Sequence, residues 1–300
     1  MISESERQQI RHHAQVWLSE HGDVLIDAVL NDDLPWRPHL YCPPAKIAVH
    51  LLLYPSINEY YLEMFDQARA KLDGLTIAVL GPIQFIQNPS VLESGHRAET
   101  QWVVLEESDG GVCCAQYDTV LSLIYQERLL LPLSSYQSIA SVSYERLLKA
   151  TGQEKGYGLE RFLAFLFSQV PGFSVVATNY NTVTEEIDIV LENRRIGGIF
   201  QRYSKPLVLA ESKNQTGKAD KNDYVQFATK IRNRRHAVSV GFLISLSGYT
   251  RDCGLEGLRD SREDFVIARL DRKDVEDWIE RSGQASGELL ESFVARAMLE

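Results

Sequence analysis

The sequence has few cysteines and no long apolar run. Its four cysteines include no Cys-x-x-Cys pair, so we predict neither a zinc site nor a disulfide framework. The apolar run 47–54 contains His50, which we interpret as a hydrogen-bonded core histidine, and it ends before Pro55. It is far shorter than the ~20 residues of a membrane span. The polar segment 1–13 is unlike a signal peptide, so we expect a soluble cytoplasmic protein with reduced thiols and no membrane contact.

Common catalytic and nucleotide-binding motifs are also missing. The chain has no phosphate-binding loop, no Gly-x-Gly-x-x-Gly fingerprint, no nucleophile elbow and no internal repeat. Its composition is that of an ordinary globular protein, with 44% hydrophobic and 24% charged residues. A length of 300 residues is enough for one large domain or two ordinary ones.

Acidic residues outnumber basic ones, but the charge is unevenly distributed. The net charge is −10, which by itself argues against a nucleic-acid binder. Residues 1–150 carry 10 basic and 19 acidic side chains, whereas residues 193–235 carry 11 basic and three acidic ones. A basic segment is what contact with phosphates requires, so we predict that nucleic acid, DNA before RNA, binds through 193–235. The alternative is a solvated surface of helix and loop, which charge alone favours.

A small polar stretch, 151–156, marks the predicted domain boundary. Before it, strands are expected over 46–54 and 76–80 and a hairpin over 102–117, so residues 1–150 are predicted to form an α/β domain. No motif in this domain assigns it a function. We consider recognition, or regulation by a small ligand or a protein partner, as hypotheses for it.

Residues 151–300 are predicted to form a second α/β domain. Its pattern is α-β-β-β-α-β-α-β, followed by one or two closing helices. The expected helices are 158–170, 220–235, 250–261 and 274–300, and the expected strands are 173–179, 187–192, 207–213, 237–245 and 265–270.

The strand expected over 207–213 ends in charged residues. Glu211 and Lys213 share one face of it, after apolar residues on both faces that are typical of an interior strand. Burying such charges unpaired is costly, so we expect a metal, a water or a phosphate at the strand end. An acid-x-Lys triplet is weak evidence alone. The chain has a second one at Asp271, but only the first ends a buried strand.

A second acid interrupts the neighbouring strand. Asp188 lies among β-branched residues, and the connection 192–206 could return the chain so that Asp188 and Glu211 meet on adjacent strands. Two carboxylates a few ångströms apart repel, and a hard cation resolves that repulsion. Oxygen ligands with open positions suit Mg²⁺ or Mn²⁺.

Glu160 is a third candidate acid. It shares a helical stripe with Leu163, Ala164 and Phe167, so it is expected to point inward. An inward glutamate without a partner is uncommon. The alternative is a helix N-terminal charge that the macrodipole favours.

Taken in order, these elements resemble the PD-(D/E)xK nuclease superfamily, and within it the Mrr-like restriction endonuclease group. The resemblance covers roughly 156–270 and rests on Gly158-Leu-Glu160, Ile187-Asp188, Glu211-Ser-Lys213, a glutamine-bearing helix and Gly241–Ser245. The residue before Asp188 departs from the pattern, since it is Ile rather than Pro. The resemblance implies a restriction-endonuclease-like fold with a mixed central sheet flanked by helices, and metal-dependent phosphodiester cleavage.

The resemblance also implies roles for individual residues. Asp188, Glu211 and the carbonyl of Ser212 would bind Mg²⁺ or Mn²⁺, and Glu160 would position a second ion or its water. Lys213 would orient or deprotonate the attacking water. Gln226, four residues before Lys230 on the next helix, would lie near the site, although a solvated polar face is an equally open interpretation.

The predicted function is therefore a magnesium-dependent DNA endonuclease, and the group resemblance suggests restriction or anti-phage defence. A dimer is considered because cutting two strands usually needs two sites. Three alternatives stay open: a nuclease for RNA or branched DNA, a non-catalytic nucleic-acid-binding or assembly module with the same fold, and a nuclease gated by a small-molecule sensor within 40–130.

Overall fold

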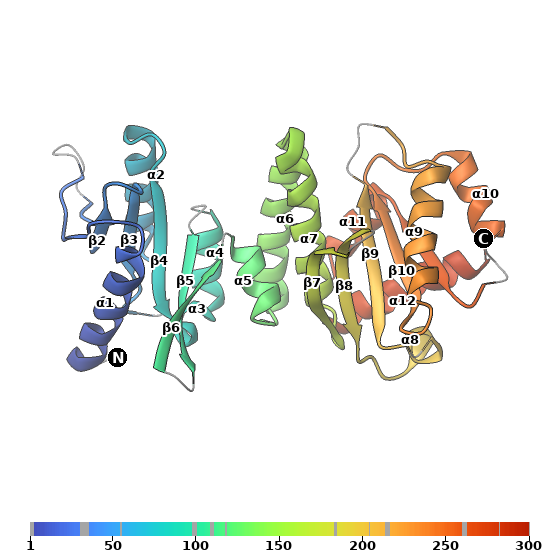
Figure 1. Ribbon diagram of the computed structural model, residues 1–300, viewed down its shortest axis with the longest axis horizontal. Coiled ribbons are helices and arrows are strands. Elements are labelled where there is room, and N and C mark those ends of the chain that lie inside the picture. The colour runs from blue at the N-terminus through green and yellow to red at the C-terminus, as the bar shows by residue number, and fades with distance from the viewer. Residues whose placement is uncertain are drawn as a thin grey trace. The chain divides into compact units, whose positions relative to one another are not determined.

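The protein is a mixed α/β molecule with two mixed sheets, as the computed structural model in Figure 1 shows. It divides into two compact units, residues 1–123 and residues 124–300. The structure describes residues 3–30, 36–54, 56–97, 101–108, 111–117, 119–182, 185–203, 205–213, 217–259, 263–281 and 283–299. No helix within these ranges is long and apolar enough to cross a membrane.

The first unit is built around a six-stranded sheet with the strand order β1-β2-β3-β4-β5-β6. Strands β3, β4 and β5 are parallel, and the outer pairs are antiparallel. The elements are α1 (Glu4–Ser19), β1 (Leu25–Ile26), β2 (Leu40–Cys42), β3 (Ile47–Leu51), α2 (Glu59–Lys71), β4 (Thr76–Pro82), α3 (Ile83–Ile86), α4 (Pro89–Arg97), β5 (Gln101–Ser108), β6 (Gly111–Tyr117) and α5 (Val120–Gln126), which continues into the second unit. The predicted α/β architecture and the β5–β6 hairpin are confirmed; its turn residues, 109 and 110, lie outside the described residues.

Both faces of this sheet are buried. Trp17 and Leu18 of α1 pack with Val49 and Leu80 on one face. His50 lies on the other face, where its ring contacts Tyr61 and Phe65 of α2. His50 is buried as predicted, and its Nδ1 atom has no hydrogen-bond partner among the described residues.

The second unit is built around a five-stranded sheet with the order β11-β10-β9-β8-β7. Strands β9, β10 and β11 are parallel, whereas β7, β8 and β9 are antiparallel, as predicted for a mixed sheet. The elements are α6 (Leu133–Lys149), α7 (Gly152–Ser168), β7 (Phe173–Asn181), β8 (Glu186–Asn193), α8 (Gly198–Arg202), β9 (Leu207–Lys213), α9 (Lys221–Asn233), β10 (Val238–Ser245), α10 (Arg251–Arg259), β11 (Val266–Leu270), α11 (Arg272–Ile279) and α12 (Gly283–Leu299).

Helices α7 and α9 cover opposite faces of this sheet. Phe242 of β10 contacts Phe167 of α7. The preceding residue, Gly241, faces α9 so closely that a Cβ atom there would lie 2.5 Å from Ile231 and 2.8 Å from Phe227. Successive strand residues point to opposite faces, which fixes α7 on one side and α9 on the other.

Two features differ from the sequence prediction. The connection from β8 to β9 contains the short helix α8, which starts after Gly197 and Gly198, both at positive φ. The compact units also divide earlier than the boundary expected at 151–156. Helix α6 packs against α7, so the polar break lies inside the second unit rather than between the two.

Candidate active site

The candidate site lies where β8 and β9 end beside each other. Strand β9 has the bounds that the sequence predicted, Leu207–Lys213. The antiparallel register pairs Ile189 with Ala210, so Asp188 and Glu211 follow the last pair at the same end of the sheet. The connection 192–206 therefore returns the chain as its length suggested, so that Asp188 and Glu211 lie on adjacent strands.

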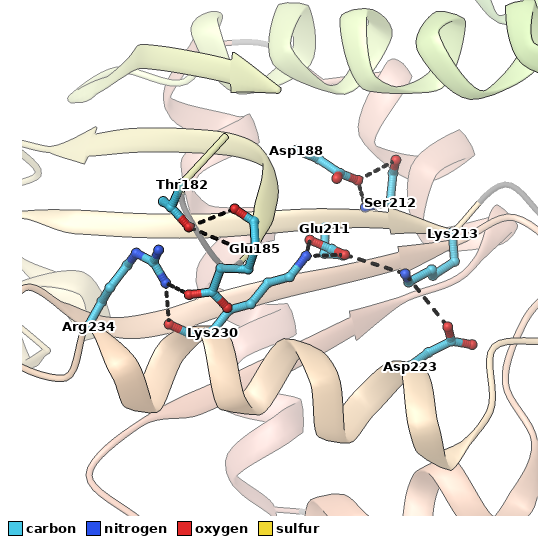
Figure 2. A network of polar contacts seen from close by, with 9 residues as sticks. All are labelled: Thr182, Glu185, Asp188, Glu211, Ser212, Lys213, Asp223, Lys230 and Arg234. Carbon is cyan, nitrogen blue, oxygen red and sulfur yellow. Dashed lines mark hydrogen bonds and ion pairs between the residues drawn. The ribbon is translucent and has the colours of Figure 1, made fainter. Parts of the chain in front are cut away.

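Asp188 is fixed by the backbone and side chain of Ser212. The Ser212 amide donates to Asp188 Oδ2 at 2.7 Å, and the Ser212 hydroxyl donates to the same oxygen at 2.9 Å. Figure 2 shows this pair above the β9 ribbon. Two hydrogen bonds on one oxygen orient the carboxylate and leave Oδ1 for another partner.

Glu211 is buried between two ammonium groups. It is 5% exposed. Both of its carboxylate oxygens accept from Lys230 Nζ at 2.7 Å, and Lys213 Nζ lies 3.4 Å from Oε1. Burial raises the pKa of Glu211 and the nearby Asp188 raises it further, while Lys230 and Lys213 act in the opposite direction.

Lys213 lies within the site and not in bulk solvent. Its Nζ atom is 3.4 Å from Glu211 and 3.6 Å from Asp223 Oδ1, and its side chain is 18% exposed. Asp223 is held in turn, since it belongs to the capping box with Asp220 that starts α9. The start of α9 therefore positions the acid that holds Lys213.

Glu160 supplies an acid that has an unsatisfied oxygen. Its Oε2 atom is buried and has no hydrogen-bond partner among the described residues. Burial, together with the charges of Asp188, Glu186 and Glu211, raises the pKa of Glu160 to about 7, against the effect of a hydrogen bond from Asn179. The sequence prediction that Glu160 points inward is confirmed by its partial burial on α7.

A second ion pair ties the neighbouring turn to α9. Arg234 donates to Glu185 and to the carbonyl of Lys230. Thr182 and Glu185 hydrogen-bond across the turn between β7 and β8, at 2.8 and 3.1 Å. Figure 2 shows the Glu185 carboxylate, Arg234 and Lys230 together beside the α9 helix. The turn that precedes Asp188 is thus anchored to the helix that carries Lys230.

Sequence reasoning missed several neighbours of the site and overstated one. Gln226 is exposed on α9 and is not among the described partners of Glu211 or Lys213, whereas Lys230, one turn later, contacts Glu211 directly. Asp223 and Asn179 were not singled out. The only signal for Asp223 was its position in an Asp-x-x-Asp helix start, and Asn179 gave a signal only in the structure, through its positive φ of 50°.

The basic segment 193–235 does not form one free cationic surface. Most of its basic side chains are engaged in ion pairs with acids such as Glu192, Glu291, Glu256 and Glu263. The paired residues are Arg194, Arg195, Lys213, Lys221, Lys230, Arg232 and Arg234. Binding of nucleic acid through this segment stays a prediction, and the pairing means that most of its basic side chains would have to share or leave an acidic partner.

The donor set suits a hard divalent cation, although the side chains are not gathered around one point. Within the described ranges, no three His, Cys, Asp or Glu side chains are arranged to hold a metal ion. The candidate donors are nevertheless carboxylate oxygens, which Mg²⁺ and Mn²⁺ prefer. Burial and neighbouring carboxylates raise the pKa values of Glu160 and Glu211, and Glu160 Oε2 has no hydrogen-bond partner among the described residues, so a cation beside these acids would stabilise their charged forms.

Comparisons with known proteins leave the family open. No protein-family model matches the chain, and no curated protein matches its sequence. Among solved structures, the EndoMS complex with double-stranded DNA has a TM-score of 0.25 at 15% identity, over 34% of this chain and 38% of that one. A repair endonuclease from Pyrococcus abyssi has a TM-score of 0.28 at 13% identity, over 41% and 48%.

A third solved structure is similar over more of the chain. Protein VC1899 from Vibrio cholerae has a TM-score of 0.29 at 10% identity, over 80% of each chain. The chain spans less than half the length of the first two proteins. At TM-scores this low, function has to be argued from the residues of the site.

Proposed function

We propose that the second unit, residues 124–300, is a metal-dependent nuclease that hydrolyses phosphodiester bonds, and that its substrate is DNA rather than RNA. The observation that carries the proposal is the grouping of Asp188, Glu211 and Lys213 at one end of β8 and β9, beside the partly buried Glu160. The superfamily resemblance of the sequence supports the same reaction, and suggests a role in restriction or anti-phage defence.

The proposed cation would be held by Asp188, Glu211 and the carbonyl of Ser212, and Glu160 would position a second ion or its water. Mg²⁺ or Mn²⁺ bound there would lower the pKa of a water ligand and neutralise phosphate oxygens. Lys213 would contribute positive charge where negative charge develops on the phosphate, from a position that Glu211 and Asp223 already fix. Asp188 is oriented in advance by Ser212, which reduces the cost of assembling the site.

Cleavage of supercoiled plasmid tests the proposal. Wild type should nick or cut the plasmid with Mn²⁺ or Mg²⁺ and be inactive in EDTA. Asp188→Asn and Lys213→Met should each lower the rate by at least about 100-fold, the scale of a lost charge-stabilising group. Asp277→Asn and Lys221→Met are matched controls, because the exposed Asp277 lies on α11 and Lys221 pairs with Glu256. Equal rates in all five proteins would refute the assignment.

RNA, single strands and branched DNA belong in the same assay. A phosphodiester is common to all of them, so the four named residues do not distinguish these substrates. If only RNA is cleaved, the proposed reaction is correct but the substrate is RNA instead of DNA.

A non-catalytic binding module is the second candidate, and one observation favours it. Both acids already have partners without a metal, since Glu211 is paired with Lys230 and Asp188 accepts two hydrogen bonds from Ser212. Under this alternative, nucleic acid would bind equally well in EDTA and in Mn²⁺ and would remain uncut. Binding measured by fluorescence anisotropy in both buffers separates the two candidates.

A further inference from the structure

Lys230 forms an ion pair with the carboxylate of Glu211, which is a proposed ligand of the metal. Its Nζ atom lies 2.7 Å from both oxygens of Glu211, so neither oxygen is free. The contact is sheltered, because the side chains of Lys230 and Glu211 are 13% and 5% exposed. A second ammonium, Lys213, is farther away at 3.4 Å and is shared with Asp223. Of the two lysines, Lys230 therefore holds Glu211 more closely.

A cation and this ammonium compete for the same atoms. Mg²⁺ binds oxygen ligands at about 2.0–2.1 Å, closer than the ammonium, so the two positive charges would be forced together around one carboxylate. Repulsion between charges at that separation is strong where water is largely excluded. Lys230 also has a backbone role that keeps it in place, since its carbonyl accepts from Arg234.

We propose that the ammonium group of Lys230 takes the place of the metal in the metal-free protein, where it neutralises Glu211. When a divalent cation binds, this ammonium group must move away from Glu211. The inference rests on the proposed function, because it assigns Glu211 to the cation. Lys230 then sets how much metal the site requires. Lys230 therefore lowers the affinity of the site for the cation, whereas a metal ligand would raise that affinity.

Calorimetric titration of the full chain with Mn²⁺ at pH 8, without nucleic acid, tests the inference. Lys230→Met keeps the length and apolar stem of the side chain and removes its charge. It should bind Mn²⁺ at least tenfold more tightly than wild type. Lys213→Met should give a smaller increase, because Lys213 shares its charge with Asp223. Lys221→Met, on the same helix but paired with Glu256, should match wild type.

The outcomes separate this inference from the proposed function. If wild type binds Mn²⁺ and Lys230→Met binds it equally or more weakly, Lys230 is not a competitor and the inference is wrong, while the nuclease proposal stands. If wild type, Lys213→Met and Lys230→Met all fail to bind Mn²⁺, both ideas are wrong. Lys230→Gln and the far-ultraviolet circular dichroism of each variant control for a folding defect in Lys230→Met.

Discussion

At the scale of single residues, the site is defined by acids that are buried or partly buried. Glu160 has one buried oxygen without a hydrogen bond, and Glu211 depends on two lysines for its balance. Native proteins seldom leave buried polar atoms unpaired, so such atoms usually have a purpose. In this protein they lie where the sequence had predicted a cation.

Removing the charge of Glu160 should stabilise the metal-free protein. The pKa of Glu160 is raised in the folded state, so its ionisation opposes folding increasingly as pH rises from 4.5 through about 7. Glu160→Gln should raise Tm by about 1–3 °C at pH 8, a small shift because the group is only partly buried, and by much less at pH 5. Thermal denaturation in EDTA at both pH values measures this. An equal shift at pH 5 would indicate a packing effect instead.

The same substitution should weaken metal binding. If Glu160 positions an ion or its water, Glu160→Gln lowers the affinity for Mn²⁺ while it raises Tm in EDTA. A variant that is more stable and binds metal as well as wild type would show that Glu160 is outside the ion's surroundings.

His50 should make the first unit sensitive to mild acid. Burial, with a smaller contribution from the charge of His39, lowers the pKa of His50 to about 3 in the folded state. The unfolded chain takes up that proton near pH 6.5, so stability falls as pH drops from 6.5 toward 3. The loss between pH 7 and pH 5 is about 2 kcal/mol. Urea unfolding at the two pH values should show it, and His50→Phe should remove most of the difference.

At the scale of elements, the position of α9 determines the site. The helix brings Asp223 to Lys213 and Lys230 to Glu211, and its last turn holds the β7–β8 turn through Arg234 and Glu185. It lies close to the sheet because β10 has a glycine, Gly241, beneath it. A small shift of this helix would therefore change every charge contact on that side of β9.

A methyl group at Gly241 should displace α9. Its Cβ atom would lie 2.5 Å from Ile231 and 2.8 Å from the rigid ring of Phe227, so overpacking should cost about 1–3 kcal/mol. Gly241→Ala should lower stability and also nuclease activity. Gly257→Ala is the matched control, because its Cβ atom would meet only Tyr224 at 3.7 Å. Denaturant unfolding and plasmid cleavage give the two measurements, and unchanged values in Gly241→Ala would contradict this role of α9.

At the scale of the whole molecule, charge is distributed unevenly along the chain. Residues 1–150 carry a large negative excess, and the basic segment of the second unit is mostly paired with acids. The role of the first unit in recognition or regulation, and the dimer, stay predictions, as does a cytoplasmic location.

Nucleic-acid binding should depend only modestly on salt. The exposed basic residues of 193–235 for which the described chain provides no acidic partner are Arg202, Lys218 and Arg235; Lys205 also has no acidic partner, but it is partly buried and donates to the carbonyl of Arg235. Each neutralised phosphate adds about −0.9 to the slope of log K against log salt, so the slope should be about −3. Lys218→Gln should make it shallower by about 1. A slope near −10 would mean that the ion pairs open when nucleic acid binds.

Much of the second unit could be predicted because its periodicity is local. The apolar run 207–210 and its charged end predicted the bounds of β9, and the two-residue period of a strand placed Glu211 and Lys213 on one face. The stripe that contains Glu160 fixed the inward direction of that side chain. These features depend on neighbours within one strand or one helix, which the sequence order determines.

The contacts that give the site its character came only from the tertiary structure. Lys230 and Glu211 are 19 residues apart, and Arg234 and Glu185 are 49 apart, so no periodicity relates them. The sequence supplied the acids and the lysines and the strand ends that carry them. Which ammonium neutralises which carboxylate was decided by the docking of α9 on the sheet, because charge pairing depends on distances that only packing between distant segments sets.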